Sequence, residues 1–243
     1  MQWFLLGLFI LLSYTLEAIT GFGSIVIAVS LGALIMPIAD LLPVLVPLNI
    51  FMSGYLVYKH RSHIQWPLLV KIIAPLMVLG TIAGTWLRPV LGNAELAAIF
   101  ALVIVIFGAR ELYKSLRNVT DRAHPRWLNQ ILIAGAGITH GLFASGGPLL
   151  VFSLAGSKID KSQMRATLLA VWFSLNSLLT LIFLYQGALT LVWPKLLMYL
   201  PLLVVGVLAG EYLHQRVSEL TFRRLIYVIL MCTGALLFIR AWL

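Results

Sequence analysis

Long apolar runs alternate with short polar connections along almost the whole chain. Runs over residues 40–58, 66–87 and 94–116 are long enough for helices that cross a bilayer. After residue 127 three more such runs end near residues 185, 213 and 242. The short alternating segments of a β-barrel are missing from the pattern. The chain is therefore predicted to be an all-α polytopic membrane protein.

Two further apolar stretches are interrupted by glycine. The first break, Thr20-Gly21-Phe22-Gly23-Ser24, separates 3–19 from 24–36, and the second break, Ser145-Gly146-Gly147-Pro148, separates 128–143 from 148–156. Glycine disfavours helix by roughly 1 kcal/mol against alanine, and unwound backbone in a membrane must face protein or a polar cavity. The arms around the first break reach only about 25 and 20 Å, against a hydrocarbon core of about 30 Å. Each stretch is therefore predicted to be a broken, re-entrant hairpin whose tip lines a site.

The two halves of the chain share a pattern of marker residues. Trp66-Pro67 matches Trp193-Pro194, and Asn49 matches Asn176, each 127 positions later. A P-x4-G-x3-G pattern also recurs at an offset of 126, in Pro75/Gly80/Gly84 and Pro201/Gly206/Gly210. Close helix packing is the favoured role of its glycines, ahead of ligand binding. We predict two repeats, 1–116 and 128–243, joined by a cytoplasmic linker over 117–127, each with one hairpin and three transmembrane helices.

Charge gives the expected orientation. The chain is 61% hydrophobic and 10% charged, with a formal net charge of +9. In a soluble protein this excess would indicate nucleic acid, but here no nucleic-acid partner is predicted, because Lys and Arg collect in cytoplasmic loops. With the basic loops at 59–63, 114–126, 158–165 and 214–224 inside, the repeats are inverted and both termini are periplasmic. We expect a multi-pass membrane protein, with the lipid bilayer as its partner.

The breaks predict an anion site. Each precedes a helix N-terminus, which carries unpaired N–H groups and about half a positive charge, and inverted halves would aim both at one midplane point. Glycine lets backbone approach a ligand, and the hydroxyl groups of Thr20, Ser24 and Ser145 add donors. Asn49 and Asn176 either flank this site or only bond between helices. The predicted substrate-binding residues are Thr20, Gly21, Phe22, Gly23, Ser24, Asn49, Ser145, Gly146, Gly147 and Asn176.

Glu17 and His140 are the ionisable residues nearest the breaks. Ionisable groups at membrane depth are functional candidates, and histidine titrates near neutral pH. We predict that both take part in proton coupling. The alternative is a structural pair or a polar contact to unwound backbone.

The chain resembles the TauE/SafE family of sulfite-exporter-like transporters over almost its whole length. The resemblance rests on the duplicated architecture, on Thr20-Gly21-Phe22-Gly23 and on Gly141-Leu142-Phe143-Ala144-Ser145-Gly146-Gly147-Pro148. It implies a secondary transporter, an exporter, of small anions such as sulfite, sulfoacetate or other sulfonates. It also implies a location in a bacterial inner (plasma) membrane. Coupling to protons or sodium stays open, and no oligomeric state is indicated.

Three other functions compete with this one. A passive anion channel would carry flux without ion coupling, and a scaffold subunit would carry none. An intramembrane enzyme would need a catalytic cluster, but the chain has no His-Glu-x-x-His zinc motif and no G-x-S-x-G nucleophile elbow. We predict no enzyme activity, no metal and no cofactor.

Overall fold

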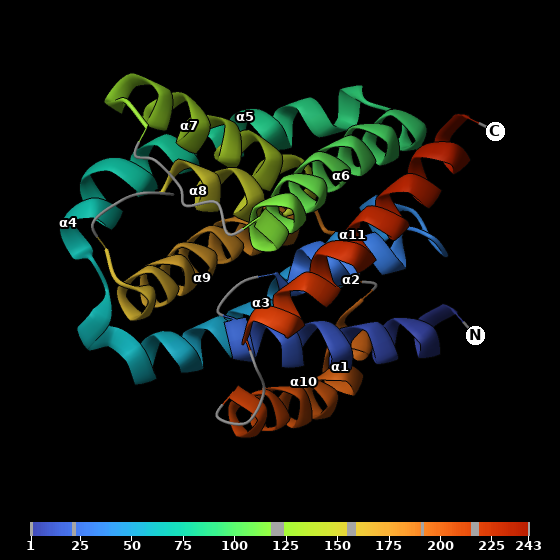
Figure 1. The fold of residues 1–243 in the computed structure, drawn as a ribbon. Coiled ribbons are helices and arrows are strands. Elements are labelled where there is room, and N and C mark those ends of the chain that lie inside the picture. The colour runs from blue at the N-terminus through green and yellow to red at the C-terminus, as the bar shows by residue number, and fades with distance from the viewer. Residues whose placement is uncertain are drawn as a thin grey trace.

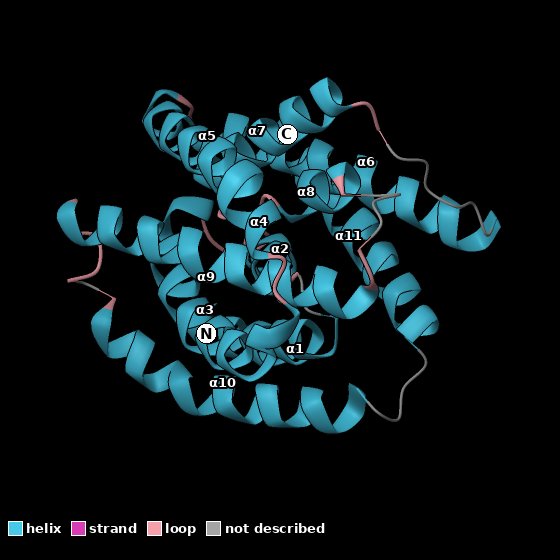
Figure 2. Ribbon diagram, turned by 90° about the vertical axis from the view of Figure 1, so that its left-hand side faces the viewer, coloured by secondary structure: helices cyan, strands magenta, loops and turns pink. Residues whose placement is uncertain are grey.

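The computed structural model describes residues 2–20, 23–117, 124–154, 159–190, 192–214 and 219–242. Every regular element in these ranges is helical (Figure 2). Six of the helices there are long and apolar enough to cross a membrane. The predicted all-α polytopic membrane fold is therefore confirmed. The elements are α1 (Gln2–Thr20), α2 (Ser24–Gly32), α3 (Ile38–His60), η1 (Arg61–His63), α4 (Trp66–Leu68), η2 (Leu69–Ile73), α5 (Ala74–Leu87), η3 (Arg88–Val90), α6 (Asn93–Arg117), α7 (Arg126–Phe143), α8 (Gly147–Ser153), α9 (Lys161–Tyr185), α10 (Trp193–His214) and α11 (Glu219–Trp242).

Helices from the two halves pack against one another in reciprocal pairs. α1 lies against α10, and α5 lies against α7 (Figure 1). These two pairs are counterparts if α1–α6 and α7–α11 are related halves. α3 packs on α9 and α6 packs on α11, so each of these helices meets its own counterpart. This exchange is what two related halves around an approximate twofold axis would produce, and the two repeats stay a prediction.

The glycines of the repeated P-x4-G-x3-G pattern lie at these contacts. A Cβ atom added to Gly80 or Gly84 would collide with the backbone of α7. One added to Gly210 would collide with Thr15 and Ala18 of α1. The pattern therefore serves close helix packing.

One predicted helix boundary, one predicted helix interior and one expected span are wrong. The helix expected over 24–36 ends at Gly32, and residues 33–36 form turns before Pro37. The single helix expected over 66–87 contains a π-helical turn, η2, just before Pro75. Proline has no N–H and its ring crowds the preceding turn, which explains the wider turn there. α1, expected to be too short to cross alone, has 19 residues and qualifies as a span.

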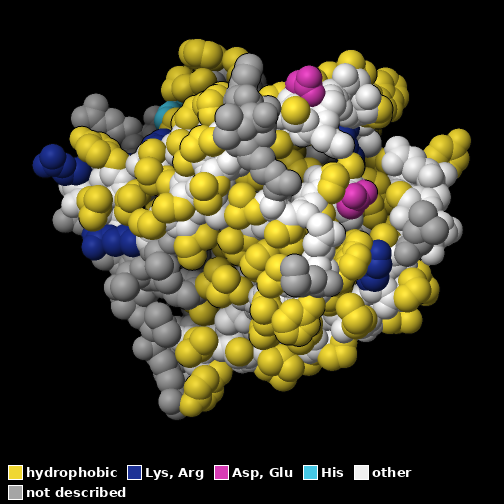
Figure 3. Space-filling view, turned by 90° about the vertical axis from the view of Figure 1, so that its right-hand side faces the viewer, with side chains coloured by type: hydrophobic (Ala, Val, Ile, Leu, Met, Phe, Trp, Pro, Cys, Tyr) yellow, Lys and Arg dark blue, Asp and Glu magenta, His cyan; other side chains and the backbone are white. Residues whose placement is uncertain are grey.

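The ends of several helices lie on two opposite sides of the molecule, which we name the Gln2 end and the Lys59 end after a residue at each. At the Gln2 end, the side chain of Gln2 donates to the carbonyl of Ile35 at 2.8 Å, so the hairpin α1–α2 starts and finishes on one side. At the Lys59 end, Lys59 of α3 forms an ion pair with Glu211 of α10 at 2.6 Å. Figure 3 shows one side of the molecule covered mostly by hydrophobic side chains, with few charged ones. This surface fits a lipid environment.

Candidate functional site

A small cavity lies where the two breaks meet. Its volume is about 20 Å³, counted as the space open to the centre of a water-sized sphere. This volume holds about one water molecule. Any larger solute requires the lining to move. The lining comes from both halves: Glu17, Gly23, Ile25, Val26, Asn49, Ala144, Ser145, Gly147, Trp172 and Asn176.

The first break is closed by a buried carboxylate. Gly23 has a φ of 109°, a left-handed conformation that favours glycine, and α2 begins at the next residue. The backbone N–H of Ser24 donates to Glu17 Oε2 at 2.8 Å. Asn49 Nδ2 donates to Ser24 Oγ at 2.9 Å and lies 3.3 Å from both carboxylate oxygens of Glu17. The start of α2 is thus occupied by the side chain that sequence analysis predicted for proton coupling.

The two matched asparagines touch. Asn176 Nδ2 donates to Asn49 Oδ1 at 2.7 Å, and both side chains are buried. α3 and α9 would be counterparts if the two halves are repeats, and this bond joins them directly. It connects the halves at the cavity and continues the network of Glu17 and Ser24. The interhelical bond and a position beside the cavity, posed as alternatives, therefore both occur.

Two buried polar groups beside the cavity lack partners. Asn176 Oδ1 and Trp172 Nε1 make no hydrogen bond, although these residues are only 1% and 6% exposed. Both residues line the cavity and lie four positions apart, on one face of α9. A buried polar group without a partner costs about 1–3 kcal/mol. The cavity therefore holds one donor and one acceptor available to a polar ligand.

The second break is built differently. Ala144 has a φ of 51° and is, in the described residues, the one non-glycine residue with a positive φ. Ser145 lines the cavity and is 7% exposed. Gly146 does not line it but packs closely against the carbonyl of Ala136. The His140 ring stacks on Trp172 with centroids 6.0 Å apart, so His140 lies behind the cavity wall.

Most of the predicted site residues come together. Six of the predicted residues that the structure describes line the cavity: Glu17, Gly23, Asn49, Ser145, Gly147 and Asn176. Ser24 is hydrogen-bonded to two of these six, Glu17 and Asn49. Gly146 and His140 lie one layer away. The side chain of Thr20, and Gly21 and Phe22 entirely, lie outside the described residues.

Sequence analysis missed Trp172 and two arginines. Trp172 precedes Asn176 by four residues, and that helical spacing could have indicated it. Arg165 donates to the carbonyl of Ala18, and Arg88 donates to the carbonyl of Gly141, each near a break. No local sequence pattern shows these contacts, which join residues 147 and 53 positions apart.

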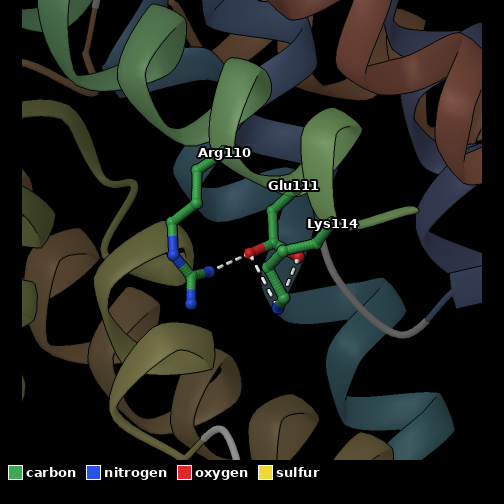
Figure 4. Close-up of polar contacts among 3 residues, drawn as sticks. All are labelled: Arg110, Glu111 and Lys114. Carbon is green, nitrogen blue, oxygen red and sulfur yellow. Dashed lines mark hydrogen bonds and ion pairs between the residues drawn. The ribbon is translucent and has the colours of Figure 1, made fainter. Parts of the chain in front are cut away.

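A charged cluster on α6 lies outside the cavity. Arg110 and Lys114 both contact the carboxylate of Glu111 (Figure 4). The Arg110 guanidinium also lies 4.0 Å from the ring centre of Phe152, so it joins α6 to α8. The cluster therefore fixes the outer side of the second hairpin.

Comparison with known proteins places this geometry in a family. The family model "Sulfite exporter TauE/SafE" matches residues 5–237. A "Probable sulfite/organosulfonate exporter TauE" of Cupriavidus necator is 25% identical over 233 residues, 93% of this chain and 89% of the relative. A "Probable inner membrane transporter protein TsaS" of Comamonas testosteroni is 25% identical over 175 residues, 71% and 72% of the two chains. The comparison with solved structures found no significant match. The chain belongs to the TauE/SafE family of sulfite exporters.

Proposed function

We propose that the protein is a secondary transporter that exports small sulfur-containing anions, such as sulfite, sulfoacetate or other sulfonates, by alternating access around the cavity. The observation that carries this proposal is the cavity itself, which both halves line and which holds unpartnered polar groups. Sites between broken helices of repeated halves are typical of secondary transporters. The sulfur anions and the export direction are taken from the names of the relatives.

The donors at the cavity suit a small oxyanion. The hydroxyl groups of Ser24 and Ser145 and the indole N–H of Trp172 can donate hydrogen bonds. No Lys or Arg is among the cavity residues of the described chain. Binding would then rest on neutral donors and on the α2 N-terminus. Such a set suits a compact anion with several acceptor oxygens once the charge of the Glu17 carboxylate in the lining is neutralised.

Glu17 supports coupling to protons. Its carboxylate takes the N–H of Ser24 and the amide of Asn49, which are donors that an oxyanion would need. When Glu17 takes up a proton, a like charge disappears from the cavity wall and these donors become available. Proton binding and anion binding therefore favour each other. His140, stacked on Trp172, is the second carrier in this proposal.

The orientation is part of the proposal. We place the Lys59 end, with its basic loops, in the cytoplasm and both termini in the periplasm of a bacterial inner membrane. The ion pair of Lys59 with Glu211 supports a common side for the ends of α3 and α10.

The geometry gives no support to an intramembrane enzyme. A Ser145–His140 pair would need a hydrogen bond from the hydroxyl group to the ring. In the described residues neither ring nitrogen of His140 bonds to the Ser145 hydroxyl group.

The test is flux in proteoliposomes. Labelled sulfite and sulfoacetate are supplied first with an imposed pH gradient and then with a sodium gradient, and a cation and a neutral sugar serve as controls. We expect saturable flux of the sulfur anions that responds to the pH gradient. Saturable binding of the sugar or cation in preference to the anions would contradict the anion site. Steady anion flux that neither gradient changes would favour a passive channel.

A further inference from the structure

Each hairpin is held at the end of its first arm by an arginine from the other half. Arg165 of α9 donates from Nη2 to the carbonyl of Ala18 in the last turn of α1, at 2.6 Å. Arg88 of η3 donates from Nη2 to the carbonyl of Gly141 in the last turn of α7, at 3.0 Å. A cation favours the negative end of a helix, and a charged donor makes a strong hydrogen bond. The two contacts are therefore alike in geometry and reciprocal between the halves.

α9 sets the two arginines at opposite ends of the cavity. Arg165 lies near its start, and the Arg88 guanidinium lies 5.1 Å from the ring centre of Phe183 near its last turn. From Arg165 to Phe183 the helix rises about 27 Å, close to the hydrocarbon thickness of about 30 Å. Trp172 and Asn176, which line the cavity, lie about halfway between them.

The Arg165 contact belongs to the Lys59 end. The loop after η1 is tied to the start of α9, because the N–H of Gln65 donates to Thr167 Oγ1 at 3.0 Å. Arg88 lies beyond the other end of α5, shortly before the start of α6. The start of α6 and the turns that follow α2 line one pocket at the Gln2 end. One arginine contact therefore lies on each side of the cavity.

We propose that Arg88 and Arg165 are positioning residues for transport, each closing one side of the cavity by holding a hairpin against the opposite half. The inference rests on the proposed function. With both bonds made, the cavity has room for about one water molecule. Release of the Arg165 bond lets the α1 end move and opens the Lys59 end, while the Arg88 bond keeps the Gln2 end closed. Release of the Arg88 bond does the reverse.

A third arginine provides the matched control. Arg224 of α11 donates from Nη2 to the carbonyl of Ser115 in the last turn of α6, at 2.6 Å. The bond is of the same type and also joins the halves, but α6 carries no break and lines no part of the cavity. If the arginines only cap helix ends, all three substitutions should act alike.

The experiment measures access to the cavity from each side. Cys232, the free cysteine, is replaced by Ser, and Ser145→Cys supplies a reporter in the cavity lining. A membrane-impermeant maleimide is added to either face of oriented proteoliposomes. Arg165→Gln should raise labelling from the Lys59 end and lower it from the Gln2 end, by about tenfold in their ratio, the effect of one charge-assisted hydrogen bond. Arg88→Gln should shift the ratio the opposite way, and Arg224→Gln should leave it unchanged.

Opposite shifts are the decisive result. Equal changes from both faces, or a shift with Arg224→Gln like the others, would overturn the proposal. If a glutamine variant does not fold, Arg→Lys at the same position keeps the charge with less reach and should give a smaller shift of the same sign; no shift there would also overturn it. Labelling does not require flux, so opposite shifts without sulfite flux would refute the transport proposal and leave the arginine contacts standing.

Discussion

The first and second breaks occupy matched places in the chain but differ in chemistry. At the first, a buried carboxylate takes the N–H that opens α2, and an amide of α3 completes the network. At the second break, no acidic residue in the cavity lining of the described chain corresponds to Glu17. Ala144 there has a positive φ, as Gly23 has at the first break. The two breaks thus share a place in the sequence pattern, while single residues decide what each does. We infer that the first break binds the proton and supplies donors to the anion, while the second break provides room for the anion.

Filling the cavity from either break should have the largest effect. Leu at Gly23 or Gly147 places a side chain in a space that holds about one water molecule. We expect anion flux to fall by about 100-fold, near the roughly 3 kcal/mol upper range for overpacking. Radiolabelled sulfite uptake into proteoliposomes measures it, and membrane insertion is checked by detergent extraction.

The control for Gly23→Leu is Gly187→Leu. Gly187 also has a positive φ, 73°, but is exposed and has nothing within 4 Å of its Cβ position. It therefore matches the backbone strain without reaching the cavity, and flux should persist. Normal flux with both Gly23→Leu and Gly147→Leu would mean that the breaks only serve packing.

Glu17→Gln should separate the roles of the breaks. Gln keeps the shape and an acceptor oxygen for Ser24 N–H but cannot ionise. We expect flux to lose most of its response to a pH gradient. His140→Ala should reduce that response less, because His140 lies behind Trp172 rather than on the cavity. An unchanged pH response in the double variant would remove the proton-coupling proposal.

The asparagine pair should show a smaller, graded difference in stability. Asn49→Ala removes the donor to Glu17 and Ser24 and the acceptor for Asn176, so we expect a loss of about 2–3 kcal/mol. Asn176→Ala removes one bond, and about 1 kcal/mol should be lost. Thermal unfolding of the purified protein in detergent measures both.

Asn129→Ala on α7 serves as the matched control for the amides. Its buried side-chain oxygen has no hydrogen-bond partner and it lies away from the cavity, so its removal breaks no bond of that oxygen and should not destabilise the protein. Equal losses for Asn49→Ala and Asn176→Ala would contradict the unequal network.

Much of the fold follows from local patterns. Apolar length located the spanning helices, and the glycine breaks located the starts of α2 and α8. The matched spacing of Asn49 and Asn176 predicted that both flank the site or bond between helices, but the bond between the two side chains was not predicted. The π-turn before Pro75 was missed, since proline is tolerated in membrane helices in several geometries.

The rest of the site depends on contacts between the halves. Nothing near Arg165 in the chain indicates that its guanidinium reaches Ala18, because that contact exists only once α1 and α9 are packed. Glu17 was predicted as a proton carrier, but its bond to Ser24 N–H was not. Ser24 lies seven residues after Glu17 in the chain, and that spacing alone does not show which oxygen meets which donor.

The smallest expected effect concerns Ala144. A left-handed alanine costs roughly 1–2 kcal/mol that glycine avoids, so Ala144→Gly should stabilise the protein by about 1 kcal/mol after glycine's greater unfolded-state entropy is subtracted. Gly23→Ala should destabilise it, because the same conformation then falls on a residue with a Cβ atom. Thermal unfolding in detergent compares the two. If Ala144→Gly is destabilising, the Ala144 methyl group contributes more by its buried packing than its backbone strain costs, and the second break is held by contacts rather than by conformation.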